Sequence, residues 1–172
     1  PNALVTREEA IVMLQRALVP SVPNVLAHTY TDFANVSSWS KQSIETFLKE
    51  GYIAGYSDNT LRPKNNITRA EVIKIIENII DIYATFGEFS GEIHGNVLVY
   101  GKNISLKNIT IDGDLIVTEG SEGTLKLENI IIQGDLITRA NVEIPGKNFK
   151  LKGKIINLTP EQPQMVSSYI ND

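Results

Sequence analysis

A four-residue pattern, glycine followed by one polar and two aliphatic residues, recurs through the second half of the chain. Its copies begin 18, 21 and 19 residues apart, at Gly95, Gly113, Gly134 and Gly153. Segments of alternating aliphatic and polar residues, such as 104–111 and 125–132, lie between the copies. Short strands at a near-constant period are typical of a β-solenoid, whose coils bury their apolar side chains only by stacking on one another.

This period predicts a short right-handed parallel β-helix (β-solenoid) of about four coils. We expect its domain to span residues 87–172 and to include a C-terminal tail, with Met165–Ile170 as a candidate cap on the last coil. The glycines are expected at the corners, where a positive φ or a close backbone approach is needed. An antiparallel sandwich of the same strands is the alternative.

The first half of the chain, residues 1–86, shows a helical period instead. Apolar residues recur about every 3.6 positions in the segments 6–18, 38–50 and 68–85, so each segment is predicted to be an amphipathic helix. The third segment is the most apolar and is expected to be buried on most sides. Together with the solenoid, these helices predict an α+β chain of two domains.

The helical half contains a repeat of its own. Val5–Ala10 matches Ile67–Val72 at an offset of 62 residues, so residues 1–19 are interpreted as the end of one repeat and 29–86 as a complete second one. In both copies a threonine is followed three positions later by a glutamate, which is the pattern of a helix capping box. The predicted capping pairs are Thr6 with Glu9 and Thr68 with Glu71.

An arginine follows the capping threonine in both copies, as Arg7 and Arg69. A cation at the first position of a helix opposes the helix dipole, so capping alone does not explain it. Two explanations stay open: an ion pair with a carboxylate of the neighbouring repeat, or an anionic ligand held by the arginine and the free N–H groups of the helix start.

Composition narrows the classes of function. The net charge is −4, which argues against a nucleic-acid partner, and no apolar run is long enough to span a membrane. Cysteine is absent, so disulfides, thiol catalysis and cysteine metal sites are excluded. The first residue is Pro1 and no signal peptide is visible, so we interpret the chain as a piece of a longer protein.

No catalytic or metal constellation stands out. His28 and His94 have no metal-ligand spacing, and we expect neither a metal nor a cofactor. Asp112, Asp114 and Asp135 recur with the solenoid period, so a role in turns is favoured over calcium binding or glycoside chemistry. The chain is therefore expected not to be an enzyme.

The segment from Thr31 to Ile80 closely resembles the S-layer homology family. The resemblance rests on Asp32-Phe33, Trp39, Ile44, the run from Gly51 to Pro63, and Ile67-Thr68-Arg69-Ala70-Glu71, in matching order and spacing. With residues 1–19 it covers about half the chain.

This resemblance implies a secreted protein of the bacterial cell surface or S-layer, anchored to an anionic, peptidoglycan-linked secondary cell-wall polysaccharide in grooves between repeats. It assigns polymer contacts to Arg69, Arg7, Trp39, Gly55, Tyr56, Ser57, Asp58 and Arg62. Trp39 has a core role as its alternative, Tyr56 and Asp58 a turn role, and Arg62 a role in bracing the loop. The competing functions are a self-associating surface scaffold and a carbohydrate-binding or carbohydrate-processing β-helix protein.

Overall fold

The computed structural model describes residues 4–18 and 29–158 of the chain. The chain divides into two compact units, with the boundary between Ile79 and Ile80. His28 and the candidate cap Met165–Ile170 lie outside the described residues. None of the described helices is long and apolar enough to cross a membrane.

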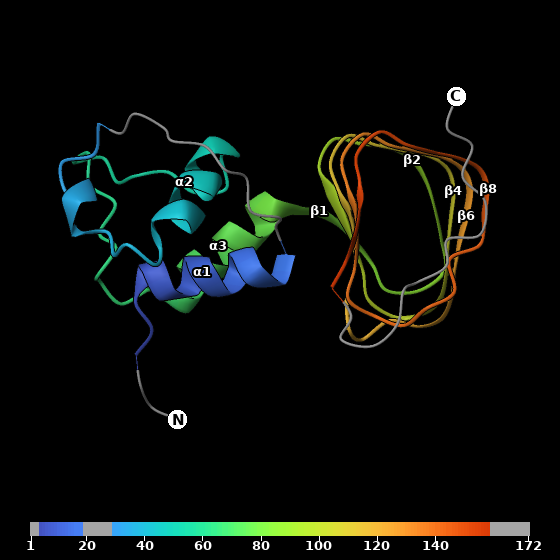
Figure 1. Cartoon of the computed structure of the whole chain (residues 1–172), viewed down its shortest axis with the longest axis horizontal. Coiled ribbons are helices and arrows are strands. Elements are labelled where there is room, and N and C mark those ends of the chain that lie inside the picture. Colours follow the sequence, from blue (N-terminus) through green and yellow to red (C-terminus); the bar gives the residue numbers. More distant parts are fainter. Residues whose placement is uncertain (1–3, 19–28, 159–172) are drawn as a thin grey trace. The chain divides into compact units, whose positions relative to one another are not determined.

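The first unit is helical. Its elements are α1 (Arg7–Leu18), the short 3-10 helix η1 (Phe33–Asn35), α2 (Lys41–Lys49) and α3 (Arg69–Ile79). Helix α1 packs against both α2 and α3 (Figure 1). The buried side chains that hold the unit together come from all three helices and include Ile11, Ile44, Phe47 and Ile75. Each helix thus turns one apolar face inward. The expectation that the third segment is buried on most sides is wrong, because α3 buries only Ile75 and Ile79 and leaves Ile73 56% exposed.

Helix α3 is shorter than predicted. The apolar run was expected to stay helical to Thr85, but the helix ends at Ile79 and strand β1 (Ile80–Ala84) follows at once. The run 80–84 is rich in β-branched and aromatic residues, and it pairs in parallel with β3. Tertiary pairing thus overrides a helical pattern that the sequence carries further, and the first strand of the second unit begins before residue 87.

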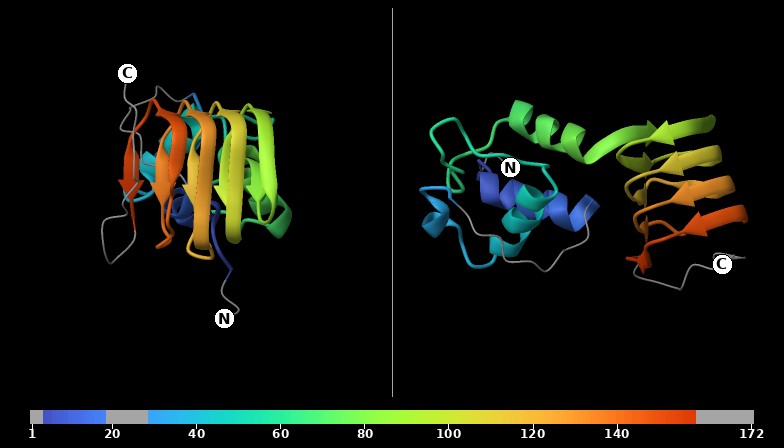
Figure 2. Two further views of the ribbon diagram at one scale, coloured as in Figure 1. Left: turned by 90° about the vertical axis from the view of Figure 1, so that its right-hand side faces the viewer. Right: turned by 90° about the horizontal axis from the view of Figure 1, so that it is seen from above.

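The second unit is a β-solenoid of parallel strands (Figure 2). After β1, its strands are β2 (Glu88–Ile93), β3 (Asn96–Val99), β4 (Lys102–Ile111), β5 (Leu115–Val117), β6 (Glu122–Ile132), β7 (Leu136–Thr138), β8 (Gly146–Leu151) and β9 (Ile155–Asn157). Odd-numbered strands form one sheet in the order β1-β3-β5-β7-β9, and even-numbered strands form the other in the order β2-β4-β6-β8. Every pairing is parallel, which confirms the solenoid and rules out the antiparallel sandwich.

The repeated glycines lie at one corner of the solenoid and stack on one another through backbone hydrogen bonds. Gly113 N–H donates to the Gly95 carbonyl at 3.2 Å, and Gly134 N–H donates to the Gly113 carbonyl at 3.0 Å. A Cβ at Gly113 would lie 2.2 Å from Oδ1 of Asn96 in the preceding coil. Glycine is therefore required by close approach, as the period predicted.

The residue after each corner glycine forms a second column. The backbone N–H of Asp114 donates to Asn96 Oδ1, that of Asp135 to Asp114 Oδ1, and that of Lys154 to Asp135 Oδ1, each at 2.7 Å. The turn role predicted for Asp114 and Asp135 is confirmed, because each side chain accepts a hydrogen bond from the next coil.

A ladder of asparagines, which the sequence did not predict, runs across the four-stranded sheet β2-β4-β6-β8. Asn108, Asn129 and Asn148 adopt φ values of 50°, 55° and 54°, in the left-handed region that asparagine tolerates. The Asn129 side chain donates to Asn108 at 2.8 Å, and the Asn148 side chain donates to Asn129 at 2.9 Å. The ladder therefore links three successive coils at equivalent positions.

Candidate functional site

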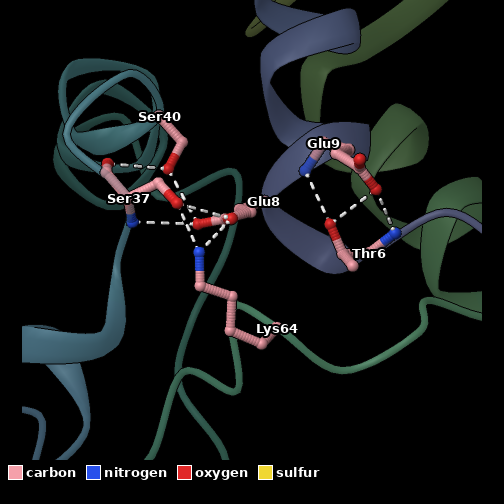
Figure 3. A network of polar contacts seen from close by, with 6 residues as sticks. All are labelled: Thr6, Glu8, Glu9, Ser37, Ser40 and Lys64. Atoms are coloured by element: carbon pink, nitrogen blue, oxygen red, sulfur yellow. Dashed lines mark hydrogen bonds and ion pairs between the residues drawn. The ribbon is translucent and has the colours of Figure 1, made fainter.

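The helix starts of the first unit carry the hydrogen bonds of two capping boxes. At α1, the Thr6 hydroxyl and N–H both donate to Glu9 Oε2 at 2.7 Å (Figure 3). At α3, the Thr68 N–H and hydroxyl donate to Glu71 Oε2 at 2.9 and 2.8 Å. Each glutamate N–H donates back to the threonine hydroxyl, at 3.4 Å in α1 and 3.2 Å in α3. Both helix starts are thus fixed locally, as this spacing of threonine and glutamate dictates.

The start of α1 is joined to the segment just before α3. The Arg7 N–H donates to the Asn65 carbonyl at 2.8 Å, and the Glu8 N–H donates to the Pro63 carbonyl at 3.0 Å. Thr6 and Asn66 form an antiparallel β-bridge. The two Thr-Arg elements, far apart in sequence, therefore lie beside each other, with the backbone donors of α1 already used.

Arg7 is buried in this junction, at 8% exposure. Its guanidinium donates to the Ala54 carbonyl at 3.2 Å and to the Tyr56 hydroxyl at 3.4 Å, and lies 3.5 Å from Glu71 Oε1. This is the ion pair with a neighbouring-repeat carboxylate that the sequence left open. Its Nε is buried without a hydrogen-bond partner among the described residues.

The loop between α2 and α3 is organised around Tyr56. The Arg62 guanidinium lies over the Tyr56 ring at 4.1 Å and donates to Asp58 Oδ2 at 2.9 Å. Asp58 Oδ1 also accepts from the hydroxyl and N–H of Thr60, at 2.6 and 3.2 Å. Asp58 thus closes a turn and Arg62 braces it, which are the structural roles left open for both residues.

Two further residues that the sequence analysis did not assign to the site hold this loop. The Tyr30 hydroxyl accepts from the Gly55 N–H at 3.3 Å, and a Cβ at Gly55 would lie 2.2 Å from the Tyr30 ring. Asp32 accepts the N–H groups of Leu61 and Arg62, both at 2.8 Å. Gly55 is therefore explained by packing, and Asp32 by backbone bonds that no local spacing reveals.

The remaining predicted contact residues are exposed. Trp39 is 54% exposed, so the core role considered for it is wrong. Ser57 and Arg69 are exposed as well. Arg69 has no side-chain partner among the described residues, in contrast to the buried Arg7.

The hydrogen bonds of this network shift three pKa values. The Tyr56 hydroxyl, followed by the N–H and hydroxyl of Thr68, lowers the pKa of Glu71 to about 2. Thr60 and Arg62 lower the pKa of Asp58 to about 2. Burial and the bond to Glu71 raise the pKa of Tyr56. Both carboxylates are therefore charged at neutral pH and hold the two arginines electrostatically.

Glu8, a buried carboxylate at 3% exposure, lies one residue beyond Arg7 and was not predicted as a site residue. Ser37, Ser40 and Lys64 converge on it (Figure 3). Burial raises the pKa of Glu8, but the hydrogen bonds from Lys64, Ser37 and Ser40 outweigh burial and leave that pKa below its usual value. The carboxylate is thus ionised inside the unit.

In the solenoid, His94 Nδ1 lies 3.0 Å from Asp112 Oδ2, and both side chains are at least half exposed. This contact raises the pKa of His94. Within 4–18 and 29–158, no three His, Cys, Asp or Glu side chains group together as a metal site.

Comparison with known proteins gives one family. Residues 29–73 match the model of the S-layer homology domain. The chain is 36% identical over 62 residues to a cellulosome-anchoring protein of Acetivibrio thermocellus, covering 36% of this chain and 12% of that protein. It is 30% identical over 114 residues to cell surface glycoprotein 1 of the same species, covering 65% and 4%.

An amylopullulanase of Thermoanaerobacterium thermosulfurigenes is 32% identical over 85 residues, covering 47% of this chain and 5% of the enzyme. The matches span between 4% and 12% of the length of these three relatives. No solved structure matches the chain. The matched residues run from before η1 into the first half of α3, and they include Asp32, Trp39 and the Thr-Arg-Ala-Glu element at 68–71. Residues 29–73 are therefore an S-layer homology domain.

Proposed function

We propose that this chain is a non-catalytic anchoring module of a secreted bacterial surface protein, which binds an anionic, peptidoglycan-linked secondary cell-wall polymer. The S-layer homology domain and the similarity to a cellulosome-anchoring protein support the anchoring role. The β-solenoid, in this proposal, serves as a structural or display element beyond the anchor.

The contrast between Arg69 and Arg7 carries the proposal. Arg7 is buried and paired with Glu71, and the N–H groups of Arg7 and Glu8 donate to carbonyls. Arg69 occupies the same position at the start of α3, yet it is exposed, and its N–H and that of Ala70 have no acceptor among the described residues. An exposed guanidinium beside free N–H groups at a helix start suits an anion.

The other proposed contacts follow from their placement. Trp39 and Ser57 are exposed and available to a sugar ring or hydroxyl. Gly55, Tyr56, Asp58 and Arg62 shape the loop, with Tyr56 partly buried under Arg62. Arg7 braces the same loop through the Ala54 carbonyl. We therefore assign Arg69 the direct contact with polymer charge, and the loop residues the shape of the surface.

Retention on native cell-wall sacculi tests this assignment. The Arg69→Ala chain is expected to lose retention about ten- to a hundredfold, because a charge-assisted contact to an anion contributes on the order of 1.5–3 kcal/mol. Lys74→Ala is the matched control, since Lys74 is an exposed cation on the same helix, paired only weakly with Glu77 at 3.6 Å. The control is expected to bind like the parent chain.

Equal retention of the Arg69→Ala and Lys74→Ala chains would contradict the assignment. Sacculi stripped of their anionic polymer supply the second control and are expected to retain neither chain. The proposal also states that the chain is not catalytic. Release of reducing sugar ends from wall polysaccharide by the chain would contradict this part. The solenoid carboxylates Asp114 and Asp135 support that part, because both are engaged by backbone N–H groups.

A further inference from the structure

The group that surrounds Glu8 has the composition of an anion-binding site. It contains one backbone N–H, two hydroxyls and one ammonium, and no second carboxylate contacts Glu8 in the described residues. These donors come from two segments, Ser37–Ser40 before α2 and Lys64 before α3. Neither segment belongs to the helix that carries Glu8. The donors therefore form a socket into which the Glu8 side chain is inserted from α1 (Figure 3).

The socket satisfies a carboxylate completely. Glu8 Oε1 accepts from the Ser37 hydroxyl at 3.0 Å and from Lys64 Nζ at 2.5 Å. Glu8 Oε2 accepts from the Ser37 N–H at 3.1 Å and from the Ser40 hydroxyl at 2.9 Å. A carboxylate offers about four acceptor positions in all, so each oxygen is used twice. The four donors are placed to bind the two oxygens of a carboxylate, and a hydroxyl or an amide would satisfy fewer of them.

The donors of the socket also make contacts other than those with Glu8. Ser40 is fully buried, and its hydroxyl lies within hydrogen-bond distance of two acceptors, Glu8 Oε2 at 2.9 Å and the Ser37 carbonyl at 3.0 Å, which share its single proton. Lys64 donates to the Ser37 hydroxyl as well. The Lys64 side chain is 52% exposed, so one side of the socket borders solvent. A small solute thus has a route to the donors when the Glu8 side chain is absent.

We propose that Ser37, Ser40 and Lys64 form a carboxylate-binding site, and that Glu8 is its built-in occupant in this chain. The position after the arginine then decides whether such a site is closed. Glu8 fills it at α1, whereas the equivalent residue at α3 is Ala70, which has no carboxylate to offer. A repeat that packs on α3 with its own serines and lysine would face Ala70 and keep its site open to a ligand carboxylate.

That last consequence rests on the proposed function, because it identifies the ligand with an acidic group of the wall polymer. The carboxylate site itself does not, since it is defined by donors within one unit. The carboxylate site is therefore tested with acetate rather than with polymer. A failure to bind acetate would not affect the Arg69 test on sacculi, and a failure of the Arg69 test would not affect the acetate result.

Thermal unfolding of the full chain with Glu8→Ala tests the site. The variant is expected to unfold at a lower temperature than the parent chain, and about 0.2 M acetate is expected to restore about 3–5 °C of Tm, since a ligand that binds only the folded state stabilises it. Sodium chloride at the same ionic strength is expected to restore none of it. The parent chain, whose site is filled, is expected to respond equally to the two salts.

Two variants make the result specific. Glu9→Ala removes the neighbouring carboxylate, which bonds only Thr6 in its capping box, and is expected to lower Tm without an acetate-specific recovery. Glu8→Ala combined with Lys64→Ala removes the ammonium and is expected to abolish the recovery. Equal effects of acetate and chloride on Glu8→Ala would overturn the proposal.

Glu8→Gln covers the case in which Glu8→Ala does not fold. The Gln side chain has nearly the same volume as Glu, but its NH2 group would face hydrogen-bond donors of the site. Acetate is therefore expected to displace the Gln side chain from these donors. Saturable shifts of the Ser37 and Ser40 amide resonances with acetate, and not with chloride, are the expected result. Unchanged resonances would count against the proposal as firmly as a failed recovery of Tm.

Discussion

The Tyr56 hydroxyl donates a hydrogen bond to Oε1 of Glu71, the carboxylate that closes the capping box of α3. One side chain thereby joins three features: Glu71 Oε2 fixes the helix start, and Oε1 accepts from the loop and lies 3.5 Å from Arg7. The capping glutamate therefore has a second task that its spacing from Thr68 does not reveal. The stability of the loop and that of the helix start are coupled through it.

Replacing Tyr56 with phenylalanine isolates this coupling. The ring beneath Arg62 stays, while the hydroxyl shared by Glu71 and Arg7 is lost. We expect the helical unit to lose about 1–2 kcal/mol, measured by chemical denaturation followed by helix circular dichroism. Tyr100→Phe is the control, because Tyr100 is 57% exposed. Equal stabilities of the two variants would show that the Tyr56 hydroxyl contributes nothing.

Acid is expected to weaken the same unit. The folded-state pKa of Glu71 is lowered to about 2 from 4.5, so Glu71 binds fewer protons when folded than when unfolded. Its stabilising contribution is fully present above about pH 4.5 and is lost as the pH falls from there toward 2. Unfolding temperatures measured across this range are expected to fall less steeply in Glu71→Gln than in the parent chain. A parallel slope in both chains would mean that other carboxylates govern the acid response.

The features that the sequence predicted correctly depend on local contacts or on a short repeated pattern. The capping pairs follow from contacts within a few residues, and the corner glycines follow from a pattern that occurs four times at near-equal intervals. The end of α3 could not be predicted in this way, because the aliphatic run through Ile79 and Ile82 fits either a buried helix or a strand. Its pairing with β3 decides between them, and that partner lies beyond the window of the pattern.

Long-range contacts explain what the sequence left open at the site. Glu8 is bonded by residues 29, 32 and 56 positions away, so nothing in its own neighbourhood marks it as buried. Arg7 and Arg69 are alike in sequence context, yet one is buried and the other exposed. Only the second repeat's loop, folded against α1, separates their roles. The repeated sequence therefore predicted equivalent roles for Arg7 and Arg69, whereas the fold places them in different environments.

The corner glycines offer a test of the solenoid. A Cβ at Gly134 would lie 2.3 Å from Asp114 Oδ1 and 2.6 Å from the Gly113 carbonyl oxygen. We expect Gly134→Ala to destabilise the solenoid by about 1–3 kcal/mol, because stacked backbone cannot move aside. Gly146→Ala is the matched control, since its Cβ would meet nothing closer than 3.4 Å. Strand circular dichroism during denaturation measures both, and a neutral Gly134→Ala would contradict the close packing of the corner.

The column of Asn96, Asp114 and Asp135 distinguishes a structural carboxylate from a chemical one. Each side chain uses Oδ1 to accept a backbone N–H from the next coil, and Asn96 shows that an amide oxygen performs this task as well as a carboxylate. We therefore expect Asp114→Asn to keep the stability of the solenoid. Asp114→Ala is expected to cost about 1–3 kcal/mol, because the Asp135 N–H loses its acceptor. Chemical denaturation of both variants, with and without a calcium chelator, is the measurement. Two results would contradict this expectation: an equal loss of stability in Asp114→Asn and Asp114→Ala, or a chelator that destabilises only the parent chain. Either result would mean that the solenoid requires the negative charge of Asp114 rather than its acceptor atom.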